Sequence, residues 1–113
     1  MLKQRNRLKK KSDFERVFKQ GKGFKEDFLY FKVAKNNLPE ARFGFIVGKT
    51  FSKKAAERNK IKRRLREIVK ENIPTIKSGI DCVLVVMPEA ENDFNKLKKA
   101  VEKLFQTAGI IVK

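Results

Sequence analysis

The stretch IDCVLVVM at residues 80–87 holds the longest uninterrupted apolar run of the chain, from Cys82 to Met87. Gly79 precedes the stretch and Pro88 follows it, and both residues interrupt regular structure. A mostly continuous β-branched run of this length is typical of a strand buried on both faces, and it is far too short to span a bilayer. We therefore expect residues 80–87 to form a central strand of a sheet.

Two amphipathic helices flank this strand in the sequence. A long helix that Ser52 can cap is expected to run to about Asn72, and a second helix from Glu91 or Asn92 to Gly109. Apolar residues recur at helical spacing in both segments, which predicts that one face of each helix packs against the sheet. These residues are Ile61, Leu65, Ile68 and Val69 in the first helix, and Leu97, Ala100, Val101, Leu104, Phe105 and Ala108 in the second.

The N-terminal part adds one short helix and two strands. Ser12-Asp13-Phe14-Glu15 has the pattern of a capping box, and Gly21 is placed to end the helix. Residues 28–34 and 42–47 are rich in aromatic and β-branched residues, as strands are. Turn residues at 36–39 predict that the second strand pairs back on the first. With 113 residues the chain is expected to be one domain, 1–113, of the α+β class, with helices mainly on one face of the sheet.

The positive charge is concentrated in two segments. Of 29 Lys and Arg residues against 13 acidic ones, residues 1–25 and 49–70 each hold ten basic and two acidic residues. Each segment therefore carries +8, and together they account for the whole net charge of +16. A surface that binds phosphates favours such clustering, because each Lys or Arg that meets a phosphate releases counterions. The charge predicts a nucleic-acid partner, and a generally solvated basic surface is the weaker alternative.

A helical wheel of the long basic helix separates an apolar side from a cationic side. With Ile61 at zero, the cations and Asn59 fall mostly opposite the apolar stripe, while Arg58 falls at its edge. We therefore expect Arg58 to be partly packed, with its guanidinium held in place for phosphate contact. An ordinary solvated helix face and a membrane-surface helix are the alternatives, but few acidic residues interrupt the cations and the apolar stripe is narrow.

Nothing in the sequence predicts a catalytic site. The chain has no His, and its single Cys82 lies in the apolar run, which is typical of a core position. The nearby carboxylates, Asp81 among them, lack the spacing of a two-metal nuclease site. The one Cys and the absence of an apolar stretch after the basic N-terminus favour a cytoplasmic location.

Three segments together resemble the protein subunit of bacterial ribonuclease P. The stretch ERNKIKRRLRE at residues 57–67 is similar to the family's basic helix signature, Arg-Asn-Arg/Lys, an apolar residue, Lys-Arg and a further Arg. Residues 5–18 resemble the family's opening, and residues 42–47 resemble the strand before its basic helix. The chain departs from the family at residues 48–50, Gly-Lys-Thr, where Ser-Lys-Lys is usual, and at Lys60, where Arg is frequent.

The resemblance implies a fold and a role for the chain. The fold is a four-stranded sheet with three helices in α-β-β-β-α-β-α order and a left-handed βαβ crossover. The role is that of a non-catalytic, monomeric subunit, one per RNA, of an endoribonuclease that removes the 5′ leader of precursor tRNA. In that enzyme the catalytic RNA performs the hydrolysis and holds most of the Mg²⁺ that the holoenzyme requires. A ribosomal protein and a DNA-binding regulator are the alternative hypotheses, and the helix offers only Asn59 for reading base edges.

The resemblance also assigns site residues. The RNA-subunit contacts fall on the basic helix and the loop before it, and the leader cleft lies between the first helix and the sheet. On the residues alone, the four apolar cleft positions could equally be core. The implied RNA-subunit contacts are Lys49, Lys53, Lys54, Arg58, Asn59, Lys60, Lys62, Arg63 and Arg66; the leader cleft is Phe14, Phe18, Leu29 and Phe31; and additional basic contacts are Arg5, Arg7, Lys9 and Lys10.

Overall fold

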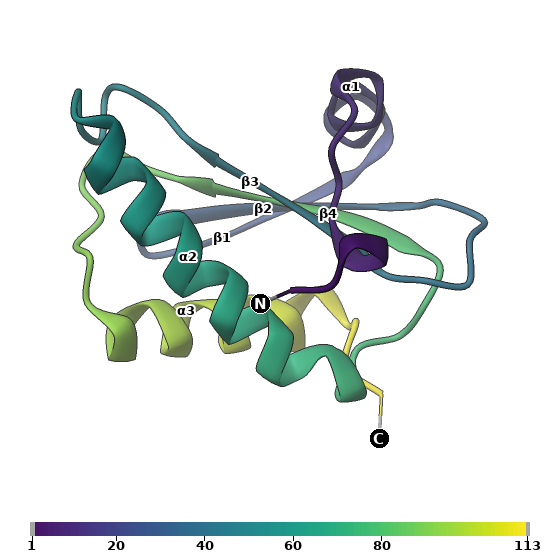
Figure 1. Ribbon diagram of the computed structural model, residues 1–113. Helices are drawn as coiled ribbons and strands as arrows, with labels where there is room; N and C mark the ends of the chain where they lie inside the picture. The colour runs from purple at the N-terminus through teal and green to yellow at the C-terminus, as the bar shows by residue number, and fades with distance from the viewer. Residues whose placement is uncertain (1, 113) are drawn as a thin grey trace.

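A four-stranded sheet divides the molecule into two unequal layers. The computed structural model describes residues 2–112 and places α2 and α3 on one face of the sheet and α1 on the other (Figure 1). The order α-β-β-β-α-β-α and the mixed fold agree with the expectation. The elements are η1 (Gln4–Asn6), α1 (Lys11–Gln20), β1 (Lys22–Glu26), β2 (Leu29–Lys35), β3 (Arg42–Val47), α2 (Ala55–Asn72), η2 (Ile73–Thr75), β4 (Ile80–Val86) and α3 (Phe94–Ala108).

The strand β4 lies inside the sheet, as its apolar sequence predicts. The strand order is β1-β2-β4-β3, with β4 antiparallel to β2 and parallel to β3. The predicted direct pairing of residues 42–47 with residues 28–34 is therefore wrong, because β4 inserts between them. The strand β4, which is buried on both faces, pairs with all seven residues of β2 and all six residues of β3, so its apolar side chains and its backbone are both accommodated at the centre of the sheet. The units β3, α2 and β4 form a parallel β-α-β motif, and its left-handed crossover stays a prediction of the resemblance.

The main core lies between the sheet and the helices α2 and α3. The four predicted apolar residues of α2 are completely buried, and the α3 face packs beside them. Phe105 of α3 contacts rings from two strands, with centroids 5.5 Å from Phe31 and 5.8 Å from Phe43. Each large buried side chain of this kind stabilises the fold by roughly 1.5–3 kcal/mol. The pairing of α2 and α3 also fixes the basic helix against a rigid surface.

A smaller core lies under α1 on the opposite face. It consists of Leu8, Val17, Ala34 and Val83, with Phe14 packed against it. A single ten-residue helix covers only part of the sheet. The α1 face is therefore thinner than the other layer, and Tyr30 and Lys32 of β2 stay only half-buried there.

The N-terminal arm, residues 2–10, crosses from one face of the sheet to the other around the β3 edge (Figure 1). Leu2 is buried in the main core and Leu8 in the smaller one. Between them Arg7 bridges to Phe43, and the Leu8 amide donates to the Phe43 carbonyl at 2.9 Å. The arm thus covers an edge that would otherwise expose unpaired backbone groups, and it brings the first basic segment next to α2.

Helix boundaries differ from the predicted ones at three N-termini. The helix α1 begins at Lys11, so Ser12 lies inside its first turn, and α2 begins at Ala55, beyond Ser52. At α3 the N-cap is Asp93, which accepts a hydrogen bond from the Lys96 amide. The predicted stop at Gly109 is confirmed, because this residue adopts the left-handed conformation with φ of 70°.

Candidate nucleic-acid interface

The two basic segments meet at one cleft. This arm–helix cleft has a volume of about 180 Å³ and lies between the N-terminal arm, α1, β3 and α2. Arg7 and Lys9 come from the first segment and Arg66 from the second, so residues about sixty positions apart in sequence line one site. The complete lining is Arg7, Leu8, Lys9, Phe14, Phe43, Gly44, Phe45 and Arg66.

Arg66 is held over the cleft without an acidic partner. Its guanidinium lies 5.9 Å from the centroid of the Phe45 ring, which is a cation–π contact. Burial lowers the pKa of Arg66, and the positive charge of Arg7 lowers it further. Among residues 2–112 neither arginine forms an ion pair with a carboxylate. Two guanidinium groups held close together repel each other, and a bound anion would relieve this repulsion.

Arg58 is positioned as the helical wheel predicts. It is half-buried, and its Nη1 donates to the Ser52 carbonyl at 2.9 Å, so the guanidinium is held in place. Arg58, Lys62 and Arg66 follow one another at four-residue spacing and share one side of α2. This side adjoins the arm–helix cleft and extends its cationic surface along the helix.

The remaining residues predicted to contact RNA differ in their exposure and in the part of the surface on which they lie. Lys49, Lys53 and Lys54 are exposed in the loop before α2, and Asn59 and Arg63 are exposed on the helix. Lys60 faces α3, away from the arm–helix cleft. Arg5 lies 3.6 Å from Glu40, which neutralises part of its charge, whereas Lys9 and Lys10 are exposed.

The structure divides the four residues predicted for the leader cleft between two faces. Phe14 and Phe18 lie on α1, and Phe18 has 37% of its surface exposed. Leu29 and Phe31 are completely buried in the main core, on the α2–α3 side of the sheet. Their assignment to a cleft with Phe14 and Phe18 is therefore wrong. The physical reason is strand alternation, since these two residues share one face of β2 and that face packs against α3.

The other face of β2 supplies the residues that the sequence prediction missed. Lys32 Nζ donates to the Phe18 carbonyl at 2.7 Å, which places Lys32 on the α1 side, and Tyr30 shares its face by alternation. Ile46 and Val85 also pack under α1. The sequence contained a signal for this face. Residues 29–35 alternate with a period of two, and the more polar set, which includes Tyr30 and Lys32, lies on the more exposed face of the sheet.

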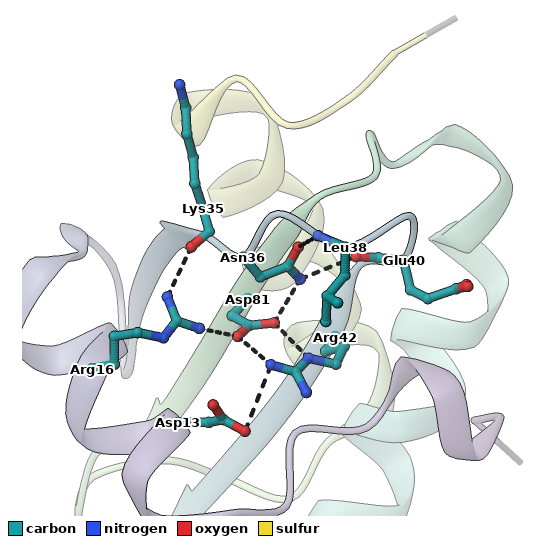
Figure 2. A network of polar contacts seen from close by, with 8 residues as sticks. All are labelled: Asp13, Arg16, Lys35, Asn36, Leu38, Glu40, Arg42 and Asp81. Atoms are coloured by element: carbon teal, nitrogen blue, oxygen red, sulfur yellow. Dashed lines mark hydrogen bonds and ion pairs between the residues drawn. The ribbon is translucent and has the colours of Figure 1, made fainter.

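A buried ion cluster fastens α1 to the sheet (Figure 2). Asp81 of β4 has no exposed surface and accepts bonds from Arg42 at 2.8 and 2.7 Å. Arg16 of α1 reaches the same carboxylate and also donates to the Lys35 carbonyl at 2.8 Å. Burial alone raises the pKa of Asp81, but the hydrogen bonds of Arg42 and Asn36 and the charges of both arginines outweigh it and lower the pKa. The cluster therefore fixes how α1 sits on the sheet.

Comparison with known proteins gives the family. The profile of the family described as Ribonuclease P matches residues 2–109. The chain belongs to the ribonuclease P protein family. The ribonuclease P protein component of Synechocystis sp. is 36% identical over 107 residues, which cover 93% of this chain and 86% of that protein.

Solved ribonuclease P proteins share the fold. That of Staphylococcus aureus aligns with a TM-score of 0.86 at 26% identity, over 94% of this chain and 97% of its own. That of Thermotoga maritima aligns with a TM-score of 0.78 at 30% identity, over 89% and 96%. As a ribonuclease P protein, the chain is a subunit of an endoribonuclease holoenzyme and a partner of the ribonuclease P RNA.

The side chains of Cys82 and Asp81, the two groups near the centre of the sheet that could take part in chemistry, are both buried. Cys82 is fully buried, and burial raises the pKa of its thiol well above the usual range. Asp81 is occupied by its two arginines. Within residues 2–112 no three His, Cys, Asp or Glu side chains gather as metal ligands do, and no helix there is long and apolar enough to cross a membrane.

Proposed function

We propose that this chain binds the catalytic RNA of ribonuclease P along α2 and the arm–helix cleft. The observation that carries the proposal is the convergence of both basic segments on one cleft, where Arg7 and Arg66 form no ion pair with any carboxylate of residues 2–112. Phosphate groups satisfy such a site because each contact neutralises charge and releases counterions. The chemistry of leader removal then belongs to the RNA and its Mg²⁺, and one monomeric protein binds each RNA.

The leader of precursor tRNA is assigned to the sheet surface beside α1. Phe18 offers an exposed ring there, Phe14 is half-buried, and Tyr30 and Lys32 lie on the neighbouring strand. Aromatic faces next to cations bind single strands with little sequence preference. A leader site needs this tolerance, because leaders differ in sequence.

Reconstitution tests the proposed role. Added to ribonuclease P RNA at low Mg²⁺, the chain is expected to restore cleavage of precursor tRNA, because its cations take over part of the charge neutralisation that Mg²⁺ otherwise supplies. The protein without RNA is expected to cut nothing. Failure to restore cleavage at any protein concentration contradicts the proposal, and so does cleavage by the protein alone.

Replacement of Phe18 tests the leader site. Phe18→Ala is expected to weaken binding of leader-bearing precursor to the holoenzyme about tenfold, the contribution of about one stacked base, and to leave mature tRNA binding unchanged. Leu38→Ala is the control, since Leu38 is equally exposed but lies in the β2–β3 loop. Both affinities are measured by titration. Equal losses for precursor and mature tRNA contradict the assignment.

A further inference from the structure

A second groove lies on the opposite side of α2 from the arm–helix cleft. It has a volume of about 530 Å³ and is lined by Lys60, Arg63, Arg64 and Glu67 of α2 and by Phe94 at the start of α3. At 100° per residue, Lys60 and Arg64 lie about 120° and 160° from Arg66 around the helix axis, whereas Arg63 lies about 60° from it, at the edge nearer the arm–helix cleft. The two sites therefore use different sides of the same basic helix. We refer to the second site as the α2–α3 groove.

The α2–α3 groove carries uncompensated positive charge. Three cations and one carboxylate line it, and within residues 2–112 none of the three cations forms an ion pair. Arg64 Nη1 donates to the Asn92 carbonyl at 3.2 Å, which ties α2 to the segment before α3. Because this bond orients one guanidinium before any ligand arrives, less side-chain freedom is lost on binding.

An aromatic ring lies beside these cations. Phe94 packs against the main core with part of its side chain and is half-buried, so the remainder faces the groove that it lines. The Asp93 cap, whose Oδ1 accepts from the Lys96 amide at 3.2 Å, fixes the backbone next to the ring. A fixed aromatic face flanked by Lys and Arg is the arrangement that holds an unpaired base and its phosphate.

We propose that the α2–α3 groove binds an unpaired nucleotide of the catalytic RNA, with the base on Phe94 and the phosphate on Lys60 and Arg64. This inference rests on the proposed function, because it requires an RNA partner. A helix with its side chains is about 10–12 Å across, so one phosphate cannot contact both sides of α2. The helix therefore lies between two segments of the RNA.

Binding to ribonuclease P RNA at several salt concentrations tests the groove. Lys60→Ala is expected to weaken binding and to reduce the salt slope by about one, as the loss of one phosphate contact does. Phe94→Leu is expected to weaken binding about tenfold with an unchanged slope, because the ring meets a base. Phe94→Tyr retains the ring and is expected to bind like the unaltered chain, which separates stacking from packing.

Lys99→Ala is the matched control for charge, because Lys99 is an exposed lysine of α3 outside the groove. Thermal unfolding of each variant establishes that it is folded. If Lys60→Ala and Phe94→Leu bind like Lys99→Ala, the proposal is overturned. If the unaltered chain itself fails to bind the RNA, the proposed function is what fails.

A tethered cleavage reagent gives an independent readout. Glu67→Cys places a thiol in the groove and Lys62→Cys places one on the opposite side of α2, while Cys82 is fully buried and stays unmodified. An iron chelate on each introduced thiol is expected to cut two different segments of the bound RNA. Cuts confined to one common segment, or no cut from residue 67, overturn the proposal.

Discussion

Single residues decide how closely α1 approaches the sheet. Gly44 of β3 lies directly under the Phe14 ring, and a Cβ built there falls 2.4 Å from Phe14 Cζ and 3.3 Å from Leu8 Cβ. Any residue with a Cβ would collide with the ring at this position. Glycine has no Cβ and therefore lets the Phe14 ring lie against the strand. The same contact forms one wall of the arm–helix cleft.

Gly44→Ala is expected to destabilise the protein by about 1–3 kcal/mol, the range for overpacking a filled site. Gly48→Ala is the control, because the nearest atom to a Cβ there is 3.5 Å away, which is ordinary contact. Urea unfolding of both variants measures the difference. In the double variant Gly44→Ala/Phe14→Ala the clash is gone. Its loss in free energy of unfolding should therefore be smaller than the sum of the losses in the two single variants. Additive losses, or equal stability of the two glycine variants, contradict this account.

At the level of elements, sequence patterns predicted the helices and the central strand but not the long-range partners. The apolar stripe of α2 and the run in β4 depend on residues close in sequence, and both were found as expected. Which strand lies beside β4 depends on packing between distant segments. The strand β1 (Lys22–Glu26) is a mostly exposed edge strand and gives almost no hydrophobic signal. Its existence followed only from the family resemblance.

The attachment of α1 to the sheet is expected to depend on pH through Asp81. Because the pKa of this carboxylate is lowered in the folded state, its stabilisation is present above the unfolded pKa of about 4 and is lost as the pH falls through the folded value. Asp81→Asn should cost about 3 kcal/mol at pH 7, since it leaves Arg16 without its carboxylate and Arg42 with only the more distant Asp13, at 3.6 Å.

Urea unfolding of the unaltered chain and of Asp81→Asn from pH 7 to pH 2 measures this dependence. The difference between the two proteins should narrow as the pH falls below about 4. Glu91→Gln, which removes an exposed partner of Lys96, is expected to change the stability far less, because solvent screens this pair, and serves as the control. If the difference in unfolding free energy between the two proteins is the same at every pH, the charge of Asp81 is not what holds α1 on the sheet.

For the whole molecule, charge and fold are coupled through the N-terminal arm. The sequence shows two segments of +8 each, but only the path of the arm around the β3 edge brings them to one cleft. That path depends on Leu2 and Leu8 entering different cores, which no local pattern indicates. The joining of the two basic segments at one cleft is therefore a property of the tertiary structure.

A double-mutant cycle on Arg7 and Arg66 tests whether the two segments act as one site. Both line the arm–helix cleft and the charge of Arg7 lowers the pKa of Arg66, so both are expected to engage the same phosphate groups. Arg7→Ala and Arg66→Ala should then couple in RNA affinity by at least about 0.5 kcal/mol, because residues that share a partner are not additive. Arg66→Ala with Lys99→Ala is the distant control pair and should add within about 0.3–0.5 kcal/mol. Dissociation constants of the single and double variants at one salt concentration supply the comparison. Additivity in both pairs would assign the arm and α2 to separate contacts, and the cleft would then lose its role as a joint RNA site.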